Sequence, residues 1–158
     1  MSRSGADLAL LLLGGYRKLV DAVIAELDVR GYPDARPVLE FAMRAIDAGA
    51  DSASELGRRL SVSKQAAAKT IATLLERGYV DIEVDPGDRR RKRVRVTDRG
   101  HSLMREGEAI FEELREEWAR TLGAAGLARL ERDLAKVVGD SAVQVQAAGW
   151  AAQEPREG

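Results

Sequence analysis

The chain has 158 residues and a formal net charge of −1. It contains no cysteine, which excludes disulfides, thiolate nucleophiles, iron–sulfur clusters and thiol-based redox sensing. Its single histidine, His101, gives little support for a histidine metal site or a catalytic triad, and its carboxylates are not gathered in a hard-cation motif. An enzyme is therefore the weakest functional interpretation, and we expect neither a metal nor a cofactor.

The first expected helix covers residues 6–29, where apolar residues recur at helical spacing. Its leucine-rich start resembles a signal peptide, but Asp7 precedes the short apolar run and Arg17 and Lys18 follow it. No stretch approaches the ~20 apolar residues of a membrane span, so we expect no membrane partner and a cytoplasmic location. Because so long a terminal helix has no other large partner surface in a small chain, its leucines favour a dimer seam over a monomer core.

Three shorter helices are predicted next. Pro37 fits the first position of the second helix. Ser52 and Glu55 form the pattern of a capping box at the start of the third helix. Ser63 then caps a fourth helix over residues 64–77, whose apolar residues cluster on one face.

The apolar period then changes from about 3.6 residues to about 2. Alternating runs at residues 79–84 and 93–97 flank a Pro-Gly turn and predict a β-hairpin. The connection, DPGDRRRK, is longer than a two-residue turn, so we expect the hairpin tip to project. Six of the seven positions from Arg89 to Arg95 are basic.

Two further helices follow the hairpin in the prediction. Thr97 or Asp98 caps a long helix from about residue 99 to 121, and the last helix ends near Gly139. We expect the tail to be partly disordered, and its Trp150 has no assigned role. The predicted fold is mainly α with a small β-hairpin wing, a winged helix-turn-helix lobe plus a helical dimerisation domain. The expected parts are an N-terminal dimerisation helix (6–33), the DNA-binding lobe (37–98), C-terminal dimerisation helices (99–140) and the tail (141–158).

Helix, turn, helix and hairpin is the order of a winged helix-turn-helix. The second helix of such a pair lies in the DNA major groove, because that groove admits one α-helix. With the apolar face toward the core, the residues expected to face DNA are Ser63, Lys64, Gln65, Ala66, Lys69, Thr70 and Thr73. A projecting arginine-rich tip suits the narrow, strongly negative minor groove. The wing residues expected at DNA are Asp88, Arg89, Arg90, Arg91 and Lys92.

The wing also resembles the signature of the MarR family of bacterial transcription regulators, an Asp-x-Arg followed by five residues and Leu-Thr-x-x-Gly. The matching positions are Asp88, Arg90, Val96, Thr97 and Gly100, and Val96 in place of Leu is the only departure. The segment ASELGRRLSVSKQAAAKTIATLLERGYVD is similar to the family's helix-turn-helix. The resemblance implies an obligate homodimer with interlocked terminal helices, a palindromic double-stranded DNA operator, and a wing Asp88 that orients Arg90 toward the minor groove.

The resemblance further implies a small effector, often phenolic or an aromatic carboxylate, bound between the lobes and the dimer domain, whose binding releases DNA. The residues that could line such a pocket are Tyr16, Tyr32, Phe41, Met104, Phe111 and Trp118. Scattered aromatic residues more often belong to an ordinary core than to a ligand site. We interpret His101 as structural or exposed rather than as a sensor.

Three functions stay open at this point. The first is a dimeric, ligand-responsive regulator, most often a repressor. The second is a DNA-binding protein without a small-molecule effector, and the third is a winged-helix module that binds protein. The basic run alone would also suit a solvated loop, but its place between two strands, after a recognition-type helix, favours DNA contact.

Overall fold

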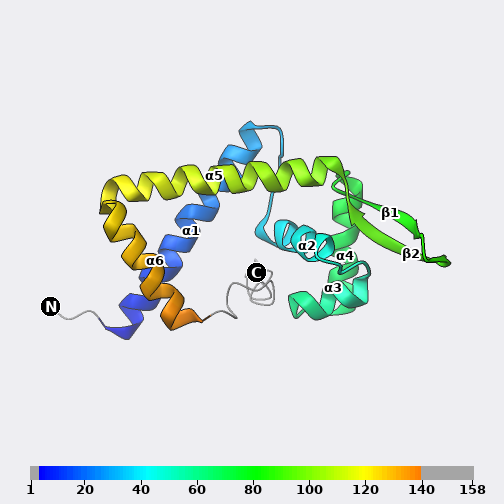
Figure 1. The fold of residues 1–158 in the computed structure, drawn as a ribbon, viewed down its shortest axis with the longest axis horizontal. Coiled ribbons are helices and arrows are strands. Elements are labelled where there is room, and N and C mark those ends of the chain that lie inside the picture. The colour runs from blue at the N-terminus through cyan, green and yellow to red at the C-terminus, as the bar shows by residue number, and fades with distance from the viewer. Residues whose placement is uncertain (1–3, 140–158) are drawn as a thin grey trace, which may run out of the picture.

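The structure, a computed structural model, describes residues 4–139. Six helices and a two-stranded antiparallel sheet follow one another along these residues (Figure 1). Their bounds are α1 (Gly5–Val29), α2 (Pro37–Asp47), α3 (Ala53–Leu60), α4 (Lys64–Glu76), β1 (Val80–Asp85), β2 (Asp88–Val96), α5 (Asp98–Leu122) and α6 (Ala124–Val138). The predicted mainly helical fold with a β-hairpin is confirmed. The expectations for the tail and Trp150 lie outside the described residues.

Helix α5 is the long axis of the molecule. Figure 1 shows it as a rod with a compact lobe of α2, α3, α4 and the hairpin at one end and α6 at the other. Helices α1 and α6 both pack against α5, whereas α3 and α4 pack mainly on each other and on α2. The chain therefore divides into a winged lobe and an arm of three helices. No helix among the described residues is long and apolar enough to span a membrane.

The start of α1 is fixed by a capping box that the sequence analysis missed. The Ser4 hydroxyl accepts a hydrogen bond from the Asp7 amide at 3.1 Å, and the Asp7 carboxylate accepts one from the Ser4 amide at 2.9 Å. The hydrogen bond from the Ser4 backbone lowers the pKa of Asp7. At the other end Gly31 has φ +92°, a left-handed conformation that suits glycine and lets the chain reverse.

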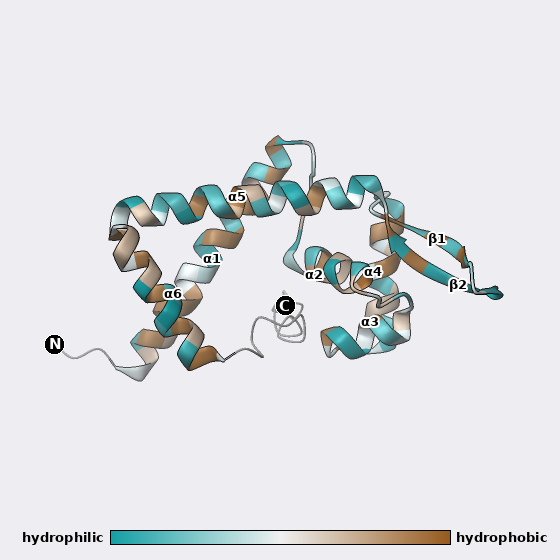
Figure 2. Cartoon of the chain, viewed as in Figure 1, coloured by the Kyte–Doolittle hydropathy of each residue, from teal (hydrophilic) through white to brown (hydrophobic). Residues whose placement is uncertain are grey.

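Among the residues that the structure describes, only the C-terminal half of α1 is covered by other elements. Val23 and Leu27 are buried, whereas the leucines of the N-terminal half are 40–66% exposed. These exposed leucines are Leu8, Leu10, Leu11, Leu12 and Leu13. Figure 2 shows hydrophobic residues along this half of α1 and on α6. On α6 and at the last residue of α5, the exposed apolar side chains are Leu122, Leu130, Val137 and Val138.

The aliphatic core of the winged lobe is continuous with the side chains that α1 and α5 bury. Met43 of α2, Leu56 of α3 and Leu74 of α4 are fully buried and belong to one cluster. Burial of side chains of this size contributes about 1.5–3 kcal/mol each, so the three helices hold one another in place. This core fixes the direction of α4 relative to the hairpin.

The predicted capping box at α3 is half formed. The Ser52 hydroxyl accepts from the Glu55 amide at 3.2 Å. The Glu55 carboxylate does not return a hydrogen bond to Ser52, because it pairs with Arg58 and Arg59. The tight turn to α4 is then made by Ser61, which has φ +55°.

The connection within the hairpin differs from the prediction. Instead of a long loop, the turn consists of Pro86 and Gly87, and β2 already begins at Asp88. The ladder is regular as far as the pair Val84–Lys92, after which Asp85 pairs with Asp88 and the intervening residues form an irregularity.

Side-chain hydrogen bonds explain this geometry. The Asp85 carboxylate accepts from the Gly87 amide at 2.8 Å, and the Asp88 carboxylate accepts from the Arg90 amide at 3.0 Å. Such local bonds compete with ladder hydrogen bonds and favour tight turns. The prediction of a longer loop was therefore wrong, while the projecting tip is visible in Figure 1.

Candidate nucleic-acid interface

Helix α4 places the expected DNA-facing residues on the open side of the lobe. Ala67 and Leu74, on the other side of the helix, are fully buried. The exposed residues are Ser63, Lys64, Gln65, Ala66 and Lys69, while Thr70 and Thr73 are half-buried. The predicted recognition residues therefore share one surface of a helix that the core holds rigidly.

The hydroxyl groups on this surface are already engaged within the helix. The Ser63 hydroxyl accepts from the Ala66 amide at 3.0 Å and is the N-cap of α4. The Thr70 hydroxyl donates to the Ala66 carbonyl, and the Thr73 hydroxyl donates to the Lys69 carbonyl, both at 3.2 Å. Each hydroxyl oxygen keeps a lone pair for another donor, but the main free donors on this surface are Lys64, Lys69 and Gln65.

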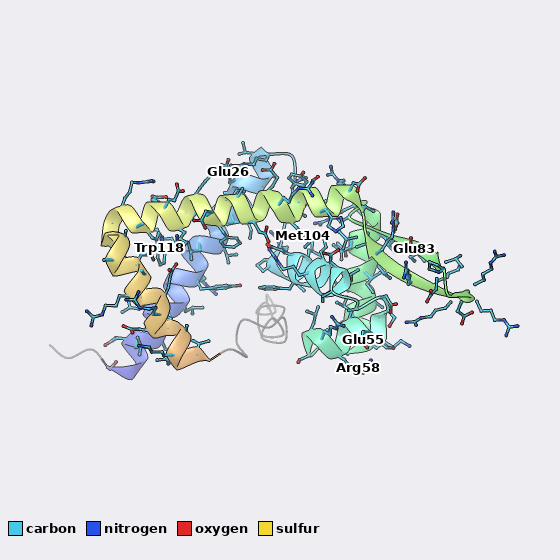
Figure 3. The ribbon with its side chains drawn as sticks, in the orientation of Figure 1. Glu26, Glu55, Arg58, Glu83, Met104 and Trp118 are labelled. Atoms are coloured by element: carbon cyan, nitrogen blue, oxygen red, sulfur yellow. The ribbon has the colours of Figure 1, made fainter. Side chains whose placement is uncertain are left out.

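The basic residues of the wing fall into two sets, and the first set is paired within the chain. Arg91 contacts Asp51 at 2.9 Å, Arg93 contacts Glu83 at 2.6 Å, and Arg95 contacts Asp81 at 3.0 Å. Figure 3 labels Glu83 on the hairpin. The hydrogen bond to Asp81 raises the pKa of Arg95. These pairs neutralise charge. The pairs of Arg93 and Arg95 join the two strands of the hairpin, and the pair of Arg91 joins the hairpin to the lobe.

The second set consists of Arg89, Arg90 and Lys92. All three are exposed, and none forms an ion pair or a side-chain hydrogen bond with any residue of the described segment 4–139. They sit at the projecting end of the hairpin, beside its irregular turn. The tip therefore presents uncompensated positive charge, even though the whole chain is close to neutral.

Asp88 acts on Arg90 through the backbone in this structure. Its carboxylate accepts from the Arg90 amide at 3.0 Å, and no contact with the Arg90 guanidinium is present. Asp88 thus shapes the chain at Arg90 and leaves the guanidinium free to extend.

Asp51, which the sequence analysis missed, ties the wing to the lobe. In addition to its ion pair with Arg91, its carbonyl accepts from the Val94 amide at 2.9 Å. An acidic residue in a short loop carries no sequence signal for such a role, because the contact joins elements that are distant in the chain.

The base of the wing is closed by an arginine between two tyrosines. The Arg99 guanidinium lies 5.4 Å from the Tyr32 ring centre and 5.2 Å from that of Tyr79. At these distances a cation is attracted by the electron-rich ring faces. Tyr32 therefore joins the loop after α1 to the start of the wing.

A pocket of about 90 Å³ lies between α1, α2 and α5. Of the six residues predicted for a ligand pocket, Tyr16, Phe41 and Phe111 line it. The full lining is Tyr16, Val20, Val23, Ile24, Leu27, Ala35, Arg36, Pro37, Leu39, Glu40, Phe41, Leu103 and Phe111. Burial, and then the charge of Glu40, raise the pKa of Tyr16, so this phenol is neutral at physiological pH.

The structure places the other three predicted pocket residues elsewhere. Tyr32 stacks at the wing base, as described above. Met104 packs against the core cluster. Trp118 lies over Gly15 of α1, where a Cβ at Gly15 would be 3.4 Å from the indole; Figure 3 labels both Met104 and Trp118. Trp118 therefore fills the space left by the glycine at the crossing of α1 and α5.

His101 makes a structural contact. Its Nε2 lies 2.8 Å from an Asp47 carboxylate oxygen and links the start of α5 to the end of α2. Within residues 4–139, no group of three or more potential metal ligands comes together.

A short helix pair, an exposed second helix and a basic hairpin define a winged helix-turn-helix. A model of the MarR family matches residues 38–91. The crystal structure of the reduced form of MarR from E. coli is similar with a TM-score of 0.67 and 22% identity, covering 88% of this chain and 99% of that one.

Two structures of MepR mutants from S. aureus share the same fold. The first has a TM-score of 0.68 and 15% identity, with 86% of this chain and 97% of that chain covered. The second, a mutant bound to an oligodeoxyribonucleotide, has a TM-score of 0.58 and 14% identity, with 83% and 95% covered. The family model and these structures show that the chain has a winged-helix fold similar to that of MarR and MepR.

Proposed function

We propose that this chain is a cytoplasmic, homodimeric regulator, most simply a repressor, that binds a palindromic DNA operator. Helix α4 enters the major groove with Lys64, Gln65 and Lys69, and the wing enters the flanking minor groove with Arg89 and Arg90. The proposal rests on which basic residues of the wing have an acidic partner and which do not. The cations at the tip have no acidic partner in the described chain, whereas those nearer the lobe are paired.

Uncompensated cations at a tip are what phosphate binding requires. Each phosphate that a Lys or Arg neutralises releases condensed counterions, which supplies much of the free energy of DNA binding. Because the tip is narrow, its arginines fit the A·T-rich minor groove, where the negative potential is strongest. Paired arginines would first have to break an ion pair and therefore contribute less.

The dimer is supported by the uncovered apolar faces of the arm. Leucines that are 40–66% exposed lie along the N-terminal half of α1, and exposed apolar surface of this kind is costly in water. Burial of such surface contributes roughly 25 cal/mol per Å². A second copy, with its own exposed α1 and α6, is the partner of matching chemistry, and a two-fold dimer would present two α4 helices to a two-fold operator.

A small aromatic effector is the finer part of the proposal. The pocket brings Tyr16, Phe41 and Phe111 together with a mainly apolar lining that also includes Arg36 and Glu40. It lies between the arm and the winged lobe, so a ligand there would touch both. Another structure of MepR is bound to ethidium bromide, and a comparable response is proposed for this chain.

A regulator without an effector is the second candidate, favoured by one observation. The pocket volume of about 90 Å³ is below the ~300 Å³ at which small-molecule sites usually begin. A ligand that binds only the folded protein must raise its melting temperature. A saturable rise with aromatic carboxylates would therefore exclude this second candidate.

The proposal is tested by fluorescence anisotropy on a duplex selected from random sequences by the wild-type protein. The experiment includes a scrambled duplex and two salt concentrations. It compares the wild type with Arg90→Ala and with a control variant, Arg105→Ala. Arg105 is an exposed α5 arginine whose side chain, among residues 4–139, bonds only Ser102. We expect selective binding that weakens with salt and with Arg90→Ala but not with Arg105→Ala. Equal affinity for both duplexes, with no change in the Arg90→Ala variant, would reject the proposal.

A further inference from the structure

A groove of about 380 Å³ lies between α4 and the start of α2. Its α4 side includes Lys69, Thr70 and Thr73, which belong to the proposed recognition surface, and Arg77 at the end of the helix. Its other side includes Arg36, the residue before α2. Figure 1 shows that α2 starts at its end away from the hairpin. The groove therefore borders the recognition surface on the side away from the wing.

The charges of this groove are all of one sign. Its charged residues are Arg36, Lys69 and Arg77, and none of the described residues that line it is acidic. A second groove of similar size, about 370 Å³, lies beside β2 and has a mixed lining. The charged and titratable residues of that second groove are Asp47, Asp51, Glu83, Arg93, Arg95 and His101. Of the two, only the groove beside α4 is suited to an anion.

Arg36 brings an unpaired charge to the groove. Its side chain is exposed and forms no ion pair or hydrogen bond with any residue between positions 4 and 139. Other arginines nearby in the chain differ, since Arg30 bonds Glu106 at 2.7 Å and Arg44 bonds Glu40 at 2.9 Å. A free guanidinium can donate two parallel hydrogen bonds to one phosphate group.

Arg77 is held in position without being neutralised. Its guanidinium donates to the Asp34 carbonyl oxygen at 2.8 Å, and it forms no ion pair with the described residues. Asp34 has φ +59°, a left-handed conformation that aspartate adopts more readily than most residues. Because a carbonyl carries no net charge, Arg77 keeps its positive charge and its other N–H donors for an anion.

We propose that this groove is a second phosphate site of the DNA interface, where Arg36, Lys69 and Arg77 bind the sugar-phosphate backbone beside the half-site that α4 enters. The inference rests on the proposed function, because it requires α4 in the major groove. Phosphate contacts fix the orientation of a protein on the duplex. With the wing on one side of α4 and the groove on the other, the backbone is held at two places and the angle of the helix is fixed.

A direct test replaces single phosphates of the selected duplex by methylphosphonate, which is uncharged. For the wild type, we expect one region of each half-site, on the side away from the wing, where the replacement weakens binding roughly tenfold. With Arg36→Ala the same replacement should have little further effect, because the contact is already lost. With Arg90→Ala the sensitivity of this region should remain.

The salt dependence of DNA binding gives a second readout. Arg36→Ala should make the log–log salt slope shallower by about 0.9 for each protomer, whereas Arg36→Lys should keep the slope. Arg77→Gln removes the charge and should act as Arg36→Ala does, while Arg105→Ala should match the wild type. Because the Arg36 side chain makes no bond within residues 4–139, its variants are expected to fold, and melting curves check this.

The two possible failures are distinguishable. A wild type that binds selected and scrambled duplexes equally rejects the proposed function. A selective wild type with no methylphosphonate effect that depends on Arg36, or with a salt slope unchanged by Arg36→Ala, overturns only the groove as a DNA site. Inorganic phosphate that raises the melting temperature of the wild type but not of Arg36→Ala, with DNA affinity equal in both, would also overturn it, because the groove would then bind a free anion.

Discussion

Arg91 on the wing donates a hydrogen bond to Asp51 at 2.9 Å, across 40 positions of the sequence. The same aspartate accepts from the Val94 amide through its carbonyl. One residue of the loop between α2 and α3 therefore holds both the backbone and a charged side chain of β2. The direction in which the free tip cations project depends on this attachment.

We predict that Asp51→Asn lowers the free energy of unfolding by only about 0.5 kcal/mol, because exposed ion pairs are screened by water. The Arg91 side chain is 55% exposed and that of Asp51 is 26% exposed. Urea denaturation of Asp51→Asn, Arg91→Gln and the double variant gives the coupling energy. A coupling energy indistinguishable from zero would show that the pair does not form in solution.

We predict that a substitution at Gly100 lowers the free energy of unfolding much more than Asp51→Asn does. A Cβ at this position would lie 2.2 Å from the Tyr79 carbonyl oxygen and 2.6 Å from Val96 Cγ1. Because the first contact is backbone, the first turn of α5 would have to move away from the base of the wing. We expect Gly100→Ala to cost about 3 kcal/mol or more, as overpacking in a tight core does.

Gly126→Ala is the matched control for Gly100→Ala. Gly126 lies within α6 and a Cβ there would make only an ordinary contact at 3.5 Å. Alanine should therefore stabilise this helix by up to about 1 kcal/mol. Calorimetry that found the two variants equally stable would contradict the close approach at Gly100.

Much of the fold could be predicted from the sequence because local patterns determine it. The change of apolar period separates the helices from the hairpin, and Pro37, Ser52 and Ser63 mark helix starts that the structure confirms. Thr97, one of the two caps considered for α5, accepts from the Gly100 amide at 3.1 Å and is its N-cap.

What could not be predicted depends on individual side-chain contacts, some of them local and others between residues distant in the sequence. The turn at Pro86 and Gly87 is set by side-chain bonds from neighbouring aspartates, which the spacing of the strands did not reveal. The sequence left open whether Trp118 lines a ligand pocket or packs in the core, and it lies over Gly15. Likewise, the sequence showed a uniform basic run, and only the tertiary pairing divides it into paired and free arginines.

The exposed leucines of α1 predict an interface between copies. Leu12→Lys puts a charge on that apolar face, so we expect the dimer to dissociate and DNA affinity to fall at least tenfold, since a monomer contacts one half-site. Sedimentation velocity measures the oligomeric state. Val29→Lys is the control, because Val29 is 81% exposed at the far end of the same helix. A Leu12→Lys protein that sediments as the wild type would exclude this face as the seam.

The contact between α5 and α6 predicts a pH dependence. Arg115 bonds Glu131 at 2.6 Å, and this hydrogen bond lowers the pKa of Glu131 from its ordinary value of 4.5. A carboxylate whose folded pKa is lowered stabilises the fold above its unfolded pKa and loses that contribution as the pH falls through the folded pKa. We therefore expect Glu131→Gln to melt below the wild type near neutral pH, and the gap to close under acidic conditions.

The control for this pH effect is Glu116→Gln. Glu116 is exposed on α5 and makes no ion pair with the residues that the structure describes. Circular dichroism melts across the acidic range should show no pH-dependent gap for it. A Glu131→Gln gap that stayed constant below about pH 4 would mean that the Arg115 contact is not electrostatic in origin.

The most direct test of the central claim is a hydroxyl-radical footprint of the wild type and Arg90→Ala on the selected duplex. We predict two symmetric protected regions with centres about one helical turn, roughly 34–36 Å, apart, flanked by minor-groove protection. With Arg90→Ala, the flanking protection should disappear and the two central protected regions should remain. A single unsymmetrical region, or a flank unchanged by the variant, would contradict a dimer that binds through α4 and the free tip arginines.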